Sequence, residues 1–420
     1  MDNTLKNYRS KTRKLVIIGM LGGISIFLGL TPLGIIHLPV MNLTIMHIPV
    51  IIGAILEGPL VGGSIGLIFG LFIVAIVSVI DYHFICQFSI VYYIVGILLT
   101  LAVHTPLGTD NNTGTYRWIK LGPISFQPTE LMKIILIITL ATLFAALHSK
   151  LDKFSSVIKI CIVAIVPIFA ILTQPDLSSS LVGVFIMCIM IFIGGVTYRI
   201  IVPVLIAAVP VSIFLGWYIQ IPHNFILHGY QYNRIQAWLH PDTYPNADNL
   251  NWQQNSAIKA IASGQLYGKF IQDGGKGLES RTYNGVGIRE SDFIWSVVGE
   301  EFGFIGCCII LLLFAIVIFK CFMVAKKAQD YLGKMIAVGV AAMFMFQVFA
   351  NICVATFIFP NTGLPLPFIS NGLSSMISSM IGIGLVMNIG IQPAKSSKEG
   401  FTMRNLNSSE NSDDEIGLDI

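Results

Sequence analysis

The sequence predicts an all-α polytopic membrane protein of about ten transmembrane helices, with a large extracytoplasmic loop between the seventh and the eighth. The first observation is composition: 55% of the 420 residues are hydrophobic and only 11% are charged, which excludes a soluble globular domain. The second is a set of membrane-length runs without Asp, Glu, Lys or Arg, the longest from Met335 to Ala394. The third is the gathering of basic residues in loops that fall on one side.

The order of the predicted helices follows from these runs. Residues 1–14 carry five basic side chains, which place the N-terminus in the cytoplasm. The segment from Thr44 to Gly58 is apolar but short and interrupted by Pro49, so we expect it to dip into the membrane without crossing. The spanning helices are predicted at roughly 15–33, 60–80, 87–105, 131–148, 156–173, 177–196, 200–219, 297–319, 334–358 and 366–390.

Counting sides along this order gives a consistent topology. The basic loops at 148–155 and 320–334 fall inside, as does the polar tail at 395–420, which its composition predicts to be disordered. The segment at 220–296 then falls outside. The seven cysteines lie in or beside apolar runs without a CxxC spacing, which is typical of small core residues.

The stretch from Val286 to Gly306 places an acid, Asp292, where the long polar segment enters a membrane-grade helix. Ser291 or Asp292 is expected to cap that helix, whose dipole favours an ionised carboxylate. Partial burial would instead raise the pKa of Asp292, as a general base requires. A helix cap alone is the simpler interpretation of this acid.

Other polar signatures also fall on the outer side. In RWIKLGPISFQPTELMK, Thr129 is expected to cap a helix on which Glu130 and Lys133 lie one turn apart, either as a functional pair or as a structural one. Asp176 lies between two membrane helices and is also compatible with a cap. Arg234 lies in the outer segment, together with an SGQLYGK string that is too weak to indicate a phosphate loop. PNTGLPLPFIS, from Pro360, breaks the backbone between the last two helices.

Taken in order, the segments RWIKLG…FQPTE…K, QPDL, AI-x-SGxxxGK, DFIWSVVGEEFGFIG and NTGLPLPFIS resemble the SEDS family of bacterial peptidoglycan glycosyltransferases (RodA, FtsW and SpoVE). The resemblance covers about residues 73–394, nearer RodA than FtsW. It implies an enzyme of the bacterial cell membrane with cytoplasmic termini, which polymerises lipid II and releases undecaprenyl diphosphate. It also implies a class B penicillin-binding transpeptidase as partner, and no nucleic acid. The resemblance places the following residues in one outer cavity: Asp292 as the catalytic carboxylate, and Trp118, Glu130, Lys133, Asp176, Arg234 and Lys269 as substrate-binding residues.

The chemistry that this implies needs a base and cations. A sugar hydroxyl is a poor nucleophile, so a carboxylate that accepts its proton assists the attack. Cations must meet the negative charge that grows on the leaving diphosphate. Arg234, Lys133, Arg117 and Lys269 are candidates, and a divalent metal, Mg or Mn, held by carboxylates is an alternative for part of that role. No organic cofactor is expected.

Residues 1–72 do not resemble the first helices of that family. They are similar to the start of a vitamin-uptake S component of ECF transporters, which indicates either a natural fusion or a chimera formed by recombination or misassembly, although the fragment is too short for a working S component. The rival function is therefore transport, as a lipid II flippase or a solute-uptake subunit. A flippase needs a polar path through the whole bilayer, whereas the ionisable residues here gather at the outer face, which favours the enzyme.

Overall fold

The computed structural model describes residues 19–20, 22–24, 35–37, 42–44, 70–109, 116–121, 124–174, 176–221, 229–272, 291–370 and 372–392. After a helix at Gly70–Val79, the α-helices are α4 (Tyr82–Gln87), α5 (Ser89–Ala102), α6 (Pro128–Leu147), α7 (Phe154–Leu172), α8 (Leu177–Ile193), α9 (Tyr198–Tyr218), α10 (Gly229–Leu239), α11 (Ala247–Gly264), α12 (Lys269–Gln272), α13 (Ile294–Lys327), α14 (Tyr331–Ala355) and α15 (Leu373–Ile391). The strands are β1 (Ile35–His37), β2 (Asn42–Thr44), β3 (Gly108–Thr109), β4 (Trp118–Leu121) and β5 (Ile124–Phe126).

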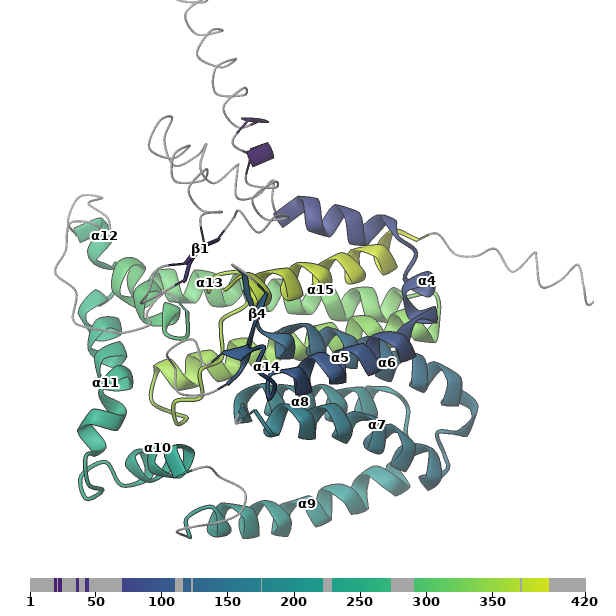
Figure 1. Cartoon of the computed structure of the whole chain (residues 1–420), viewed down its shortest axis with the longest axis horizontal. Coiled ribbons are helices and arrows are strands. Elements are labelled where there is room, and N and C mark those ends of the chain that lie inside the picture. The colour runs from purple at the N-terminus through teal and green to yellow at the C-terminus, as the bar shows by residue number, and fades with distance from the viewer. Residues whose placement is uncertain are drawn as a thin grey trace, which may run out of the picture.

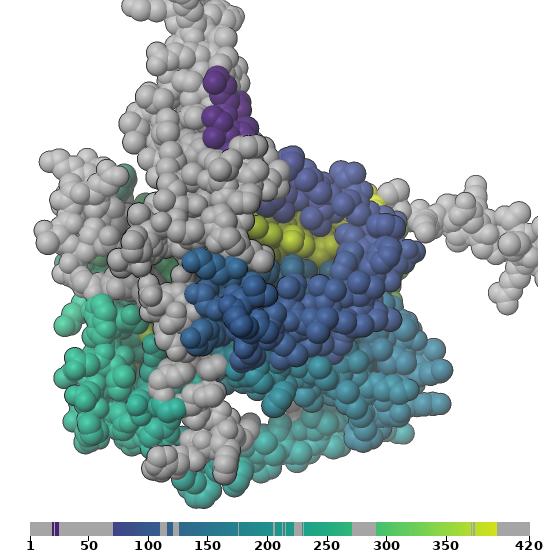
Figure 2. Space-filling view, viewed as in Figure 1, coloured from purple at the N-terminus to yellow at the C-terminus, as the bar shows by residue number. Residues whose placement is uncertain are grey.

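The long helices run side by side, while α10, α11 and α12 stand as a column across one end of them (Figure 1). In the described ranges six helices are long and apolar enough to cross a membrane, and three shorter apolar helices accompany them: Gly70–Val79, α5 and α8. On the face shown in Figure 2, the blue residues of Gly70–Val79, α4 and α5 lie beside the yellow of α15. The chain is a multi-pass helical membrane protein, as predicted.

Contacts between loops sort the helix ends into two groups, which agree with the predicted sides. At one end His83 Nε2 lies 3.0 Å from Asp330 Oδ2, and the Tyr331 hydroxyl donates to the Gly194 carbonyl. At the other, His104 Nε2 lies 3.0 Å from Thr173 Oγ1. We call the second the outer end, because it carries α10 to α12, and the first the inner end.

The eight predicted helices from 87–105 onward correspond to α5 to α9 and α13 to α15. The predicted start of the last helix was wrong: α15 begins at Leu373 and not near 366, because Pro365, Pro367 and a positive φ of 63° at Phe368 keep that segment out of a helix. The small antiparallel sheet β3-β4-β5 was also not predicted. The expectations for most of 15–33, for 45–58 and for 395–420 lie outside the described residues.

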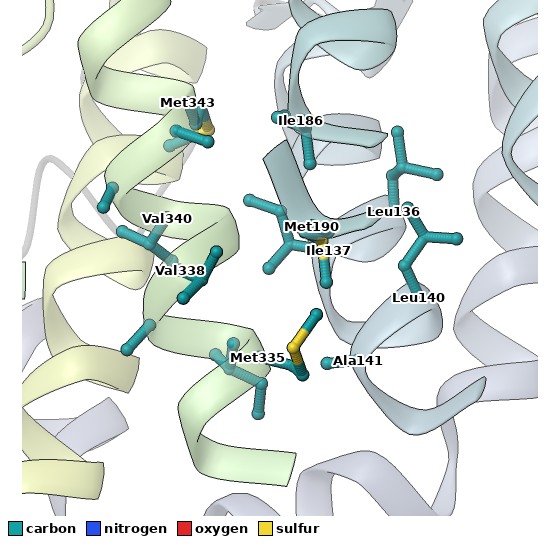
Figure 3. Close-up of a cluster of buried hydrophobic side chains, with 14 of the residues drawn as sticks. Leu136, Ile137, Leu140, Ala141, Ile186, Met190, Met335, Val338, Val340 and Met343 are labelled. Atoms are coloured by element: carbon teal, nitrogen blue, oxygen red, sulfur yellow. The ribbon is translucent and has the colours of Figure 1, made fainter. Parts of the chain in front are cut away.

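The core lies where α6, α8 and α14 meet, midway between the two ends. Their hydrophobic side chains interlock as a buried cluster (Figure 3), including Leu140, Ile186 and Met335, each fully buried. Gly339 of α14 lets Ile137 approach closely, since a Cβ there would lie 2.6 Å from the Ile137 side chain. This apolar layer separates the outer polar residues from the inner ones.

At the inner end a polar cluster joins the helix Gly70–Val79 to α15. Asn388 of α15 donates from Nδ2 to the carbonyls of Val77 and Ser78, at 3.2 and 2.8 Å, where the helix Gly70–Val79 ends. These carbonyls have no partner within their own helix, so Asn388 satisfies them. The Tyr82 hydroxyl donates to Asp330 Oδ1 at 2.6 Å and so ties α4 to the turn before α14.

Helix α13 is kinked at Gly303, whose φ of 64° and ψ of −166° are reached almost only by glycine. The backbone N–H groups freed by the kink donate outward, from Phe304 to the Gln265 carbonyl at 2.9 Å and from Ile305 to the Leu266 carbonyl at 3.2 Å. Gly268 sits against the same kink with a φ of 79°. The glycines of the SGQLYGK string therefore allow two backbones to meet.

We expect Gly303→Ala to destabilise the protein by about 1–3 kcal/mol from backbone strain alone, and further because the new Cβ would overlap the Gly268 backbone nitrogen. The measurement is the midpoint of thermal unfolding in detergent. Gly216→Ala is the control, since a Cβ there meets nothing within 4 Å. Equal midpoints for the two variants would show that the kink carries no strain.

Candidate functional site

Asp292 lies at the outer end, two residues before α13 begins. The expectation that Ser291 or Asp292 caps this helix was wrong: the cap position is Phe293, and no side chain there bonds the helix end. Phe293 and Trp295 are buried instead in a small apolar cluster with Leu366 of the loop before α15. That packing fixes where α13 starts and leaves the Asp292 carboxylate outside the helix.

The broken backbone between α14 and α15 holds the segment that carries Asp292. Asn351 of α14 donates from Nδ2 to the Asp292 carbonyl at 2.9 Å and to the Leu364 carbonyl at 2.7 Å. Ser370 donates from its hydroxyl to the Ser291 carbonyl at 2.6 Å and accepts from the Leu366 N–H at 2.7 Å. Both polar side chains are almost completely buried.

The Asp292 carboxylate itself faces the turn at Gly363, where a Cβ would lie 3.2 Å from Oδ2. Gly363 has a φ of 72°, so only glycine suits this position both sterically and conformationally. Burial raises the pKa of Asp292, against a hydrogen bond from Ser291 and the charges of Arg117 and Arg234, which lower it. The Asp292 carboxyl group therefore binds its proton more tightly than the carboxyl group of an exposed aspartate does.

Arg117 and Arg234 reach the same place from different elements. Arg117 precedes β4, and Arg234 lies on α10, where its Nη1 is 3.5 Å from the Asn361 carbonyl. Together they line a cleft at the outer end, whose other lining residues are Leu177, Gln231, Ile235, Pro360, Asn361 and Thr362. Two guanidinium groups beside a cleft and near a carboxylate form a site suited to a phosphate-bearing substrate.

The outer helices hold the loop that borders this cleft. Trp238 of α10 donates from Nε1 to the Phe357 carbonyl at 3.0 Å, and Gln254 of α11 donates to the carbonyls of Val354 and Phe359, each at 2.8 Å. Phe357 is held at a φ of 64°, a strained conformation for a bulky residue. Strain of this kind persists only where surrounding contacts enforce it, and it often marks functional sites.

Asp176 lies near the site but is occupied as the cap of α8. It is 2% exposed, and its carboxylate accepts from the Ser179 N–H at 3.0 Å, the Ser179 hydroxyl at 2.8 Å and Gln127 Nε2 at 3.4 Å. Its charge raises the pKa of Asp292. The capping interpretation of Asp176 is therefore confirmed, and its effect on the cleft is mainly electrostatic.

Glu130 and Lys133 form a buried ion pair, with Lys133 Nζ 2.8 Å from Glu130 Oε1 and side chains 0% and 2% exposed for Lys133 and Glu130. They lie on the first turns of α6, whose cap position is Gln127 with Pro128 next, and not Thr129 as expected. Ser378 of α15 donates to the Glu130 carbonyl at 2.8 Å. Enclosed in this way, the pair anchors the outer end of α6 against α15.

Lys269 and Trp118 are placed differently from the cleft residues. Lys269, at the start of α12, pairs with the nearly buried Glu300 of α13. Its charge is thus used to join the outer column to α13. Trp118 is partly buried in β4, opposite Thr109 of β3, and follows directly after Arg117. The pairing of Trp118 with β3 therefore fixes the backbone next to Arg117.

The donors that the structure describes do not by themselves form a metal site. In the described ranges no group of three or more His, Cys, Asp or Glu side chains is arranged to hold an ion. Near the cleft the two acids are Asp292 and Asp176, and Asp176 already accepts several hydrogen bonds. Two arginines supply positive charge there, so we derive no step through a metal.

Sequence reasoning missed Asn351 and Ser370 as parts of the site. Asn351 lies inside an apolar run, where a lone amide costs free energy unless it is bonded, and that was the available signal. Ser370 belongs to the PLPFIS string, which was recognised as a break in the backbone but not as a support for Asp292.

Comparison with known proteins places this geometry in context. The model of the "Cell cycle protein" family of FtsW, RodA and SpoVE matches residues 63–395. Peptidoglycan glycosyltransferase MrdB of Escherichia coli K12 is 32% identical over 301 residues, covering 71% of this chain and 76% of MrdB. Stage V sporulation protein E of Bacillus subtilis is 31% identical over 293 residues, covering 70% and 75%. Probable peptidoglycan glycosyltransferase FtsW of Trichlorobacter lovleyi is 30% identical over 312 residues, covering 74% and 77%.

Two solved structures share the fold. One, from work on structural coordination of polymerization and crosslinking by a peptidoglycan synthase complex, superimposes with a TM-score of 0.61 at 24% identity, covering 90% of this chain and 96% of its own. The other, rod shape determining protein RodA of Thermus thermophilus, gives a TM-score of 0.54 at 22% identity, covering 90% and 97%. Both likenesses include the arrangement of the long helices.

Removing one member of the Glu130–Lys133 pair should destabilise the protein, because the other charge is left buried. We expect Lys133→Met to cost about 3–5 kcal/mol, and the double variant Glu130→Gln/Lys133→Met to cost clearly less. Thermal unfolding in detergent measures both. A Lys133→Met protein of normal stability that fails to bind substrate would instead place Lys133 in the cleft.

Proposed function

The chain belongs to the family of cell cycle proteins that comprises FtsW, RodA and SpoVE, and from this premise we propose that it is a peptidoglycan glycosyltransferase that polymerises lipid II. The observation that carries the proposal is the Asp292 carboxylate, which is not used as a helix cap and has a raised pKa beside a cleft with two arginines. The names of the relatives, at about 30% identity over most of the chain, support the same activity.

In the proposed reaction, the 4-hydroxyl of one lipid II sugar attacks the anomeric carbon at the end of the growing glycan. The bond from that carbon to the diphosphate oxygen breaks, and undecaprenyl diphosphate leaves with the bonding electrons. Asp292 accepts the proton of the attacking hydroxyl. Its raised pKa suits this role, because a stronger base takes a larger share of the proton in the transition state.

Arg117 and Arg234 carry the second role, which is to meet the charge on the departing diphosphate. A guanidinium pairs with phosphate oxygens through two parallel N–H groups, so it both binds and orients the leaving group. Such preorganised donors contribute most where charge develops during the reaction. Asp176, Glu130, Lys133 and Lys269 then hold the framework around the cleft, and Trp118 supports Arg117.

Transport is less well supported. A flippase would need polar groups from the outer to the inner end, whereas the buried middle of α6, α8 and α14 is an apolar cluster (Figure 3). The ion pair Glu130–Lys133 and the cleft lie at the outer end of these helices. The basic loops of the sequence support an active site that faces the outer side of a bacterial cell membrane, with the termini in the cytoplasm.

We propose in addition a class B penicillin-binding transpeptidase as partner. A polymerase of glycan strands needs a second activity that crosslinks its product. The likeness to a chain in a peptidoglycan synthase complex supports this kind of assembly. The elongation, division and sporulation relatives match comparably, so the proposal is confined to the shared reaction.

Asp292→Asn keeps the size of the side chain but removes the base. We expect polymerisation of purified lipid II to fall by at least about 100-fold, within the usual contribution of a general base. Expression and thermal unfolding should stay unchanged, because the carboxylate caps no helix. Glycan chains on a gel report the product, and a near-normal rate for Asp292→Asn would refute this mechanism.

Arg234→Gln should act on both binding and proton affinity. Loss of a charged hydrogen bond to the diphosphate should raise KM for lipid II on the order of 10- to 100-fold. Loss of a nearby cation also raises the pKa of Asp292 further, so the acidic limb of the rate profile should move to higher pH. Arg199→Gln is the control, since Arg199 is exposed at the inner end. An unmoved limb and KM would remove Arg234 from the site.

A further inference from the structure

Two side chains outside the cleft hold Asp292, and their arrangement resembles a clamp. The carboxylate receives no orientation from the helix that follows, because the cap position is Phe293. The backbone on which it sits is instead fixed at consecutive carbonyls. Ser370 bonds the carbonyl of Ser291 at 2.6 Å, and Asn351 bonds the carbonyl of Asp292 at 2.9 Å.

Each of these side chains also bonds the loop before α15. Asn351 donates its second N–H to Leu364 at 2.7 Å, and Ser370 accepts from Leu366 at 2.7 Å. The same loop contains Gly363, which lies against the Asp292 carboxylate. Asn351 and Ser370 therefore tie the acid and its neighbouring turn into one unit from two sides, α14 and the loop itself.

Burial makes this clamp rigid. Asn351 is 1% exposed and Ser370 is 3% exposed, so water does not compete for either bond. Rotation about the Ser291–Asp292 backbone would break at least one of them and leave a buried polar group without a partner. Small displacements of a catalytic group are costly, since a shift of about 1 Å can lower a rate by on the order of 100-fold.

We propose that Asn351 and Ser370 are positioning residues that set the direction of the Asp292 carboxylate for proton transfer. The inference rests on the proposed function, and it assigns a role in that function to two residues that contact neither the cleft nor the substrate. Both act through Asp292, so their removal should change the chemical step more than substrate binding.

The test uses the full-length protein in detergent with lipid II as substrate. Ser370→Ala should lower kcat on the order of 10- to 100-fold with KM for lipid II nearly unchanged. It should also shift the acidic limb of the rate profile, because the carboxylate enters a different environment. Ser370→Thr, which retains the hydroxyl, should recover a large part of the loss.

Matched controls separate positioning from stability. Tyr331→Phe removes another hydroxyl that donates to a backbone carbonyl, at the inner end. We also test Asn351→Leu. Its control is Asn388→Leu, which removes a similarly buried amide that donates to backbone carbonyls. We expect all four variants to lower the unfolding midpoint, but only those at Ser370 and Asn351 to lower kcat and move the acidic limb.

The outcomes are distinct. The clamp is refuted if kcat falls in proportion to the unfolding midpoint in all four variants. It is also refuted if Ser370→Ala has a normal rate and pH profile. If Asp292→Asn abolishes polymerisation in either case, the proposed function stands. An Asp292→Asn protein that still polymerises lipid II would refute the role of Asp292 and with it the clamp, whereas an unchanged protein that makes no glycan from lipid II would refute the proposed function itself.

Discussion

The outer half of this protein depends on one constraint: backbone polar groups at membrane depth must find partners within the protein. Between α14 and α15 the chain gives up helical hydrogen bonds over more than a dozen residues. Trp238, Gln254 and Asn351 donate to carbonyls in and around that break. An irregular segment is thereby made rigid, and a carboxylate can be placed beside it. The site therefore lies where buried side chains satisfy the backbone groups of an irregular segment.

The charges of the site obey a related rule. Three buried acids of the described outer region have a counter-charge or a set of donors: Glu130 has Lys133, Glu300 has Lys269, and Asp176 has the start of α8. Asp292 differs because its nearest charges belong to a cleft that a ligand can enter. A group whose charge is only partly compensated changes its proton affinity when a substrate arrives, and this distinguishes it from its paired neighbours.

The sequence was sufficient for the membrane class, for the order of the helices from α5 onward and for the grouping of the polar segments at one end of the helices. Uncharged runs and basic loops carry that information locally. The partner of each ionisable residue was less accessible. Lys269 and Glu300 are 31 positions apart. Their spacing does not show that the backbone at Gly268 packs directly against the backbone of α13. The role of Asn351 likewise depends on a loop that folds back over α14.

The hydrogen bonds from Asn388 to the end of the helix Gly70–Val79 have a consequence for biogenesis. The two partners are separated by about 310 residues, so the carbonyls of Val77 and Ser78 emerge from the ribosome long before Asn388 exists. During synthesis that helix end must be satisfied by water or lipid headgroups at the inner surface. That helix end gains its protein partner only when α15 inserts, because Asn388 lies in the last turns of α15. A nascent chain that stops after α14 already contains the core helices α6, α8 and α14, but the end of the helix Gly70–Val79 would still lack Asn388.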